Sequence, residues 1–545
     1  MKADTLFKNG KIYTLVNEGD CAEALAVKDG RIVFVGSNAD AADIEADEVV
    51  DLGGRTMLPG LGDSHLHFFA YCQTLTTVDL GAAKSKKEAM QMLADKAAET
   101  PAGEWIRGNN FDQSKWSDCE DEIPTKADLD AVSTEHPIFM KRVCLHTAVA
   151  NSKALEVAGV GKDYEFGVGG LVELDENGYP NGILREQAPK IFDEIIPDPA
   201  KVPEIKAKLM DTALAKAARE GVTQIHTYAA DIWKYTEDFD DYKALERAGK
   251  LPLRVSIYLD TYYTKPYLTQ KEVEDPYRLV QYGGYKIFSD GSLGSRSAAL
   301  FEPYDDDPTT TGIFVQSQDA LNEKMLKAYE MGLQPATHCI GDAGLDAVLT
   351  AIEYTLAKSR EHGMTEREQA TRDPFRIIHA QMARPELIER MCKLPVVIDI
   401  QPSFYCTDLH WIEDRVGAER AAHSYQWKTY IDKGLILTGG SDCPVEDFNP
   451  WYGIYAAVTR KDLEGYPEGG CHPEEKVSPY EAICMFSKNI AIAIGQQAQL
   501  GTLEAGKFAD MVVVEQDPFE IPEDELLHVV NDQTWVAGRK VFERA

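Results

Sequence analysis

Short apolar segments that alternate with helix-like stretches constrain this chain most. The β-rich segments read GVTQIHTYAA, GGYKIFSDG, LQPATHCIGD, FRIIHAQM, LPVVIDIQP and LILTGGSD. Helix-like stretches such as PEIKAKLMDTALAKAARE and DALNEKMLKAYEMG separate them. Strands that alternate with helices predict a parallel sheet with right-handed crossovers. Because the unit repeats over several hundred residues, we expect a closed (β/α)8 TIM barrel rather than an open sheet.

The two ends of the chain have a different pattern from the middle. Residues 5–58 contain short strands around N-G, D-G and G-G turns, and the segment after residue 497 returns to this style. We therefore predict a small β-sandwich domain built from both chain termini, residues 1–58 and 497–545, around a barrel at 59–496. Residues from about 70 to 200 do not follow the βα rhythm, and we expect them to form an insertion over the barrel mouth.

Composition excludes several classes of protein. The chain has 545 residues, of which 44% are hydrophobic and 27% charged, as expected for a globular protein. Its net charge of −34 disfavours nucleic acid and anionic membranes as partners. No apolar stretch approaches the ~20 residues that span a bilayer, and the first residues do not resemble a signal peptide. The ten cysteines form no CxxC pair, so we expect a cytoplasmic protein.

One local motif points to a metal ion. In LPGLGDSHLHF, His65 and His67 lie two residues apart at the end of an apolar segment. On a strand, residues i and i+2 point to the same side, so both imidazoles can reach one ion. An H-x-H pair alone is a weak signal, because a single histidine is more often a structural core residue.

The other strand-like segments also end in residues that can bind metal. These residues are Lys286, His338, His379 and Asp442. The carboxyl ends of the strands meet at one mouth of a (β/α)8 barrel, where catalytic groups lie. Histidines and an aspartate that converge there suit Zn²⁺ or a similar ion. Neither the G-x-S-x-G elbow of serine hydrolases nor a G-x-G-x-x-G nucleotide loop is present.

With these motifs the sequence resembles the amidohydrolase superfamily, and within it the YtcJ-like group (amidohydrolase family 3), which includes N-substituted formamide deformylase. The resemblance covers nearly the whole chain. It rests on PGLGDSHLHF, LHTAVANSKAL, YKIFSDGSLGSRSAAL, THCIGD, IIHAQ, GGSDCPV and the closing LGTLEAGKFADMVVV.

The resemblance implies a binuclear metal centre. His65, His67 and Asp442 would hold the more buried ion, and His338 and His379 the second. Lys286 would carry CO2 as a carbamate that bridges two divalent ions, with Zn²⁺ the first choice and Fe, Mn or Co also suited. Carbamylation turns a lysine ammonium, a poor ligand, into an anion with two oxygen donors.

The resemblance also implies a reaction, attack of a metal-activated hydroxide on a non-peptide amide carbonyl. Asp442 would accept the proton and return it to the leaving nitrogen. His146 is expected to face the substrate, and His226 and Arg296 are further candidates for substrate binding. The partner would be a small-molecule amide, such as an N-substituted formamide, and a homodimer is the expectation for the family.

Two alternatives stay open at this point. The first is a cyclic amidase or a mononuclear aminohydrolase on the same fold. Aminohydrolases usually carry a strand-end His-x-x-Glu motif, whereas HCIGD offers Gly341 and Asp342. The second is a non-catalytic scaffold protein that kept the fold and lost the site, which the complete ligand set opposes.

Overall fold

A computed structural model describes most of the chain and divides it into two compact units. The described residues are 1–119, 122–142, 147–167, 169–193, 195–197, 202–229, 239–260 and 278–545. One unit comprises Met1–Phe69 and Ala213–Ala545, and the other comprises Ala70–Thr212. Among the described residues, no helix is long and apolar enough to cross a membrane.

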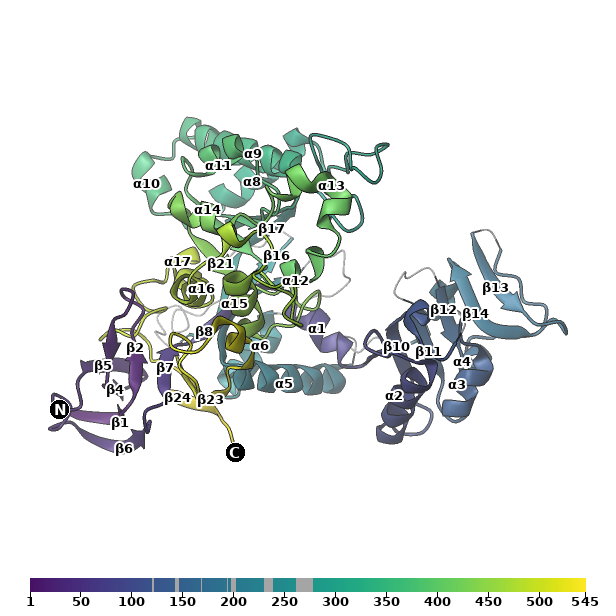
Figure 1. Cartoon of the computed structure of the whole chain (residues 1–545), viewed down its shortest axis with the longest axis horizontal. Coiled ribbons are helices and arrows are strands. Elements are labelled where there is room, and N and C mark those ends of the chain that lie inside the picture. Colours follow the sequence, from purple (N-terminus) through teal and green to yellow (C-terminus); the bar gives the residue numbers. More distant parts are fainter. Residues whose placement is uncertain are drawn as a thin grey trace. The chain divides into compact units, whose positions relative to one another are not determined.

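The first unit contains eight parallel strands in barrel order. The strands are β8 (Leu61–Leu66), β15 (Val222–Ala229), β16 (Arg254–Leu259), β17 (Val280–Phe288), β18 (Gln334–Cys339), β19 (Phe375–His379), β20 (Val396–Ile400) and β21 (Leu437–Gly439). Four of them, β8, β16, β17 and β21, are labelled in Figure 1. Seven parallel ladders join the eight strands from β8 through β15 and onward to β21. The predicted (β/α)8 barrel is therefore confirmed, and its open side lies between its first and last strands.

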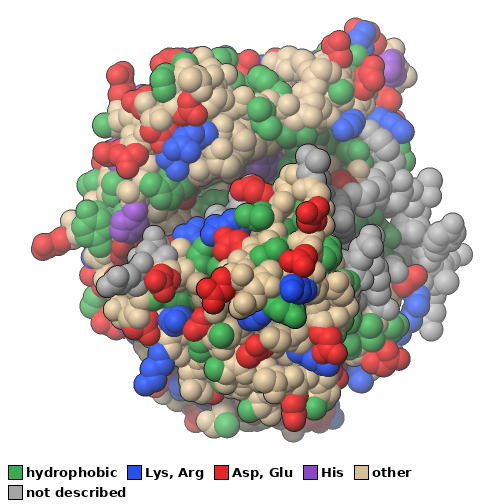
Figure 2. Space-filling model, turned by 90° about the vertical axis from the view of Figure 1, so that its right-hand side faces the viewer, with side chains coloured by type: hydrophobic (Ala, Val, Ile, Leu, Met, Phe, Trp, Pro, Cys, Tyr) green, Lys and Arg blue, Asp and Glu red, His purple; other side chains and the backbone are tan. Residues whose placement is uncertain are grey.

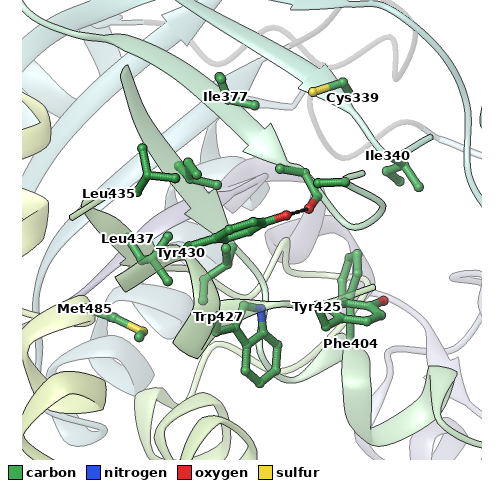
Figure 3. Close-up of a cluster of buried hydrophobic side chains, with 14 of the residues drawn as sticks. Cys339, Ile340, Ile377, Phe404, Tyr425, Trp427, Tyr430, Leu435, Leu437 and Met485 are labelled. Carbon is green, nitrogen blue, oxygen red and sulfur yellow. Dashed lines mark hydrogen bonds between the residues drawn. The ribbon is translucent and has the colours of Figure 1, made fainter. Parts of the chain in front are cut away.

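Helices follow or separate the barrel strands. They are α1 (Phe68–Thr74), α5 (Pro203–Arg219), α6 (Phe239–Arg247), α8 (Gln318–Glu330), α9 (Asp342–Glu361), α10 (Glu366–Ala370), α11 (Pro385–Met391), α12 (Phe404–Asp408), α13 (Ile412–Ala421), α14 (Trp427–Asp432), α15 (Pro450–Thr459), α16 (Pro479–Met485) and α17 (Lys488–Ala493). Apolar side chains of α8, α9 and the helices from α11 to α16 build one large core with the strands. In Figure 3, Trp427 and Tyr430 of α14 lie with Leu437 of β21 and Met485 of α16 in this core.

Strands from both chain ends pack as two sheets, which confirms the predicted terminal sandwich. One sheet has the order β5-β4-β1-β6 and the other β24-β23-β22-β7-β2-β3. Their strands are β1 (Lys2–Lys8), β2 (Lys11–Tyr13), β3 (Cys21–Ala22), β4 (Ala24–Lys28), β5 (Arg31–Gly36), β6 (Glu45–Asp51), β7 (Thr56–Pro59), β22 (Met511–Val514), β23 (Asn531–Val536) and β24 (Arg539–Glu543). The ring of Phe7 meets the edge of Trp535 at 5.0 Å between centroids, so residues from both ends share one core.

The second unit has its own sheet and core. Its strands lie in the order β13-β14-β12-β11-β10-β9. They are β9 (Val78–Asp79), β10 (Ile106–Phe111), β11 (Ile138–Arg142), β12 (Thr147–Ala150), β13 (Gly170–Leu174) and β14 (Pro180–Glu186), with helices α2 (Lys86–Glu99), α3 (Lys126–Val132) and α4 (Ser152–Val157). Phe111 and Trp116 are buried in this core. The place of this segment over the barrel mouth stays a prediction, as do the domain boundaries.

Acidic side chains are spread widely over the surface. Figure 2 shows Asp and Glu side chains across the face that it draws, with Lys and Arg among them, in keeping with the net charge of −34. Charge of one sign in this excess repels polyanions.

Candidate metal centre

Strand β8 brings two histidines to the mouth of the barrel. His65 is fully buried and His67 is 8% exposed, and their ring centroids lie 5.5 Å apart. Nδ1 of His67 lies 2.6 Å from the carbonyl oxygen of Tyr228. A carbonyl can only accept, so this nitrogen carries the hydrogen and Nε2 of a neutral His67 presents a lone pair.

Asp442 directly faces these two imidazoles. Its Oδ1 lies 3.4 Å from Nε2 of His65 and 3.2 Å from Nε2 of His67. This buried oxygen has no hydrogen bond to the described residues, and neither has Nδ1 of His65. A carboxylate oxygen and an imidazole lone pair at 3.2 Å repel each other unless a cation or a proton lies between them. The carboxylate oxygen of Asp442 and the Nε2 atoms that face it thus fit a bound metal ion.

Two further histidines follow from β18 and β19. Nδ1 of His379 lies 2.6 Å from Oε1 of Gln401, whose Nε2 donates to the carbonyl of Asp399, so Nε2 of His379 is left for a ligand. Nε2 of His338 lies 3.0 Å from the carbonyl oxygen of Gly291, which leaves Nδ1. The two rings lie 4.5 Å apart. One nitrogen of each ring is therefore held by the protein and the other is available.

Three of these side chains form a tight group. His65, His379 and Asp442 each bring one ligand atom to within 4.8 Å of the other two. Burial lowers the pKa values of His65 and His338 well below the usual range of histidine, and it lowers the pKa of His379 to about 4. These imidazoles are therefore neutral ligands near pH 7. A neutral nitrogen set with one carboxylate matches the chemistry of zinc.

Lys286 lies beside this group at the end of β17. Its Nζ is 3.4 Å from Nε2 of His65 and lies over the rings of Tyr228 and Phe288. The residue is 2% exposed. Burial lowers the pKa of this amine to about 7, against the opposing charge of Asp442. A substantial fraction is thus a neutral amine near pH 7.

The barrel interior beneath the site contains a polar layer that sequence reasoning missed. Arg376 forms a fully buried bidentate pair with Asp399. Its remaining donors reach Tyr258, His226 and the carbonyl of Ser64. One guanidinium therefore connects five strands through all five of its N–H groups. The available signal was a charged residue within each of two apolar runs, FRIIH and VVIDI.

The other sequence-predicted site residues do not join the cluster. His226 is fully buried, with Nδ1 2.7 Å from Arg376 and Nε2 3.0 Å from Gln224, so its contacts give no support to substrate binding. Arg296 forms a bidentate ion pair with Asp306 in the segment after β17. His146 lies outside the described residues.

The comparisons with known proteins agree with this architecture. The model of the family described as "Amidohydrolase family" matches residues 48–542. YtcJ of Bacillus subtilis (strain 168), whose name describes it as an amidohydrolase, is 33% identical to this chain over the full length of both proteins. N-substituted formamide deformylase of Arthrobacter pascens is 27% identical over 99% of this chain and 98% of its own.

Solved structures show the same likeness. The crystal structure of an uncharacterized metal-dependent hydrolase from Pyrococcus horikoshii OT3 superposes with a TM-score of 0.73. That protein is 28% identical, and the alignment covers 95% of this chain and 99% of the other. The fold, the family match and full-length relatives agree, and the chain therefore belongs to the amidohydrolase family.

Proposed function

We propose that this protein is a metal-dependent hydrolase that cleaves the C–N bond of a small non-peptide amide, with N-substituted formamides as the first substrates to test. The observation that carries the proposal is the buried group of His65, His379 and Asp442, whose ligand atoms lie within 4.8 Å of one another. The deformylase activity named for the Arthrobacter pascens relative suggests the substrate class.

In this proposal the six residues at the barrel mouth would hold two divalent ions. His65, His67 and Asp442 would hold one ion, and His338 and His379 the other. Lys286 would connect them: its neutral amine adds to CO2, forms an N–C bond and loses a proton, which gives a carbamate anion. The burial of Lys286 supports this step, because the loss of solvent around Nζ disfavours the ammonium form.

The ions, when bound, supply Lewis-acid activation of water and polarisation of the substrate carbonyl. The chain's own proton carrier is Asp442. Cations bound beside Asp442 would keep its carboxylate ionised, because an opposite charge nearby lowers the pKa of an acid. The carboxylate is thus an anion that can accept the proton of the attacking water and deliver it to the leaving nitrogen.

Metal analysis is the first test. Protein purified without chelator is analysed for Zn, Fe, Mn and Co per chain, beside Lys286→Ala. A matched control is Lys243→Ala, which removes a buried lysine that is paired with Glu246. We expect about two ions per chain in the parent and the control, and fewer in Lys286→Ala.

A substrate screen follows on the metal-loaded protein. Release of formate from N-substituted formamides, abolished in Asp442→Asn, would support the proposal. Ring opening of cyclic amides or release of ammonia from aminopurines would move the protein to the other reactions of this fold. Protein that binds no metal, even with zinc and bicarbonate supplied, would favour a non-catalytic role.

A further inference from the structure

The first and last barrel strands meet along a seam that carries three of the proposed metal ligands. His65 and His67 lie on the β8 side, and Asp442 follows β21. No strand ladder joins β8 to β21 in the described part of the chain. At the lower end of the seam, Gly62 N donates to the carbonyl of Phe486 and Asn489 Nδ2 to that of Leu437. The residues between Phe486 and Asn489 thus contact both strands there.

The upper part of the seam is closed by two backbone bonds and one carboxylate. Asp442 N donates to the carbonyl of His65 and His67 N to that of Cys443, each at 2.7 Å. Below them lies Asp63, which is 2% exposed. Its Oδ1 accepts from His65 N at 2.9 Å, and its Oδ2 accepts from Ser441 N at 3.1 Å and from Ser441 Oγ at 2.5 Å. This carboxylate therefore binds both sides of the seam.

The same contacts reach both neighbours of Asp442. Ser441 N and Oγ are bound by Asp63, and Ser441 Oγ in turn accepts from Cys443 N at 3.0 Å. Asp442 itself has a φ of 55°, in the left-handed region that a non-glycine residue rarely adopts. Such a conformation costs roughly 1–3 kcal/mol and persists only where the surroundings hold it. Asp63 restrains Ser441, the residue before Asp442, directly. Through the Ser441 hydroxyl it also restrains Cys443, the residue after Asp442.

We infer that Asp63 is a positioning residue for the metal centre, because its carboxylate sets the distance between His65 and the strained Asp442. The inference rests on the proposed metal site. Groups that orient metal ligands typically contribute 10- to 100-fold to metal affinity. Asp63→Asn keeps the size of the side chain but turns an N–H group toward the Ser441 donors, so the two sides of the seam should separate.

The experiment measures Co²⁺ binding to the full-length metal-free protein by its visible absorption spectrum, together with thermal unfolding. We expect Asp63→Asn to weaken Co²⁺ binding 10- to 100-fold and to alter the absorption bands of the loaded protein. Ser441→Ala should change the Co²⁺ affinity and the absorption bands in the same direction but to a smaller extent. Ser441→Thr, which keeps a hydroxyl group, should restore both to the parental values. The matched control is Asp510→Asn, which breaks a buried pair with Arg254, a residue at the start of β16. It should lower only the unfolding temperature.

Three results would overturn the inference while the metal site stands, the third of them needed only if Asp63→Asn does not fold. One is a Co²⁺ affinity and a set of absorption bands in Asp63→Asn that equal those of the parent protein. Another is an equal loss of affinity in Asp510→Asn, which would mean general destabilisation. If Asp63→Asn does not fold, the serine variants decide, and equal affinities in Ser441→Ala and Ser441→Thr would overturn it. A parent that binds no Co²⁺ would instead overturn the proposed function, and this inference with it.

Discussion

His338 donates its Nε2 hydrogen to the carbonyl oxygen of Gly291, 3.0 Å away. The bond fixes the tautomer of a proposed ligand from a loop rather than from a neighbouring strand. That loop is in turn held by Asp290, whose carboxylate accepts from Ala299 N and Gly341 N at 2.9 and 2.8 Å and from Ile340 N at 3.1 Å. The orientation of His338 therefore depends on Asp290.

Asp290→Asn should weaken the binding of the ion that we propose at His338 and His379. The new amide turns hydrogens toward backbone donors, which costs about 1–3 kcal/mol for each buried group left unpaired. We expect 10- to 100-fold weaker binding of one of two ions, measured by elemental analysis after dialysis against graded zinc. Asp307→Asn, in the same segment but partly exposed and hydrogen-bonded only locally to Thr309, is the control and should bind as the parent does. Unchanged stoichiometry in Asp290→Asn would contradict the dependence.

The lysine carbamate predicts a carbon signal of its own. Metal-free protein reconstituted with zinc and ¹³C-bicarbonate should show one enriched carbamate resonance by NMR. The resonance should be absent in Lys286→Ala and present in Lys243→Ala. A spectrum without it in fully metal-loaded protein would remove Lys286 from the ligand set.

Asp408 predicts a pH dependence of stability. Burial raises its pKa from 3.8 to about 6, although Tyr425 and Gln381 donate to it. The folded state then binds the proton more tightly than the unfolded state, so this contribution is present below pH 4 and is lost as pH rises through 6. A pKa raised to this extent corresponds to about 3 kcal/mol in the free energy of unfolding.

The measurement is urea unfolding of metal-free protein between pH 4 and pH 7. The free energy of unfolding should fall with pH more steeply in the parent than in Asp408→Asn. Asp432→Asn, an exposed carboxylate, should follow the parent. Parallel curves for the parent and Asp408→Asn would show that Asp408 titrates normally.

The close approach of the Phe486 ring to Gly439 predicts that substitutions at these two positions compensate each other. A Cβ at Gly439 would lie 2.4 Å from the Phe486 ring, so Gly439→Ala forces the ring or the strand to move. Overpacking of this kind costs roughly 1–3 kcal/mol. Combined with Phe486→Leu, it should cost less than the sum of the two single changes in thermal unfolding. Gly161→Ala, where a Cβ meets nothing within 4 Å, is the control. Strict additivity would contradict the contact.

The sequence predicted most of the barrel because each strand carries its own signal. An apolar run such as FRIIH is fully buried in β19, and His379 at its end reaches the mouth as expected. The H-x-H spacing likewise placed His65 and His67 beside each other. Local patterns of this kind need no knowledge of distant residues.

Features that depend on residues far apart in the chain could not be predicted in this way. Asp63 precedes the H-x-H pair at a spacing that only suggests a shared face, and its partner Ser441 lies 378 residues away. His226 illustrates the same limit: it occupies a strand position typical of a site residue, and its ring contacts Arg376, which lies 150 residues away. A single sequence does not report such pairings.

The separation of Asp63 from Ser441 also bears on the order of events during synthesis. Residues of the first barrel strand leave the ribosome long before those of the last, at an elongation rate of about 5–20 residues per second. Until Ser441 and Asp442 emerge, His65 and His67 have no partner across the seam. The proposed set of metal ligands is therefore complete only after Asp442 has been synthesised, when the residues of strands β8 to β20 are already present.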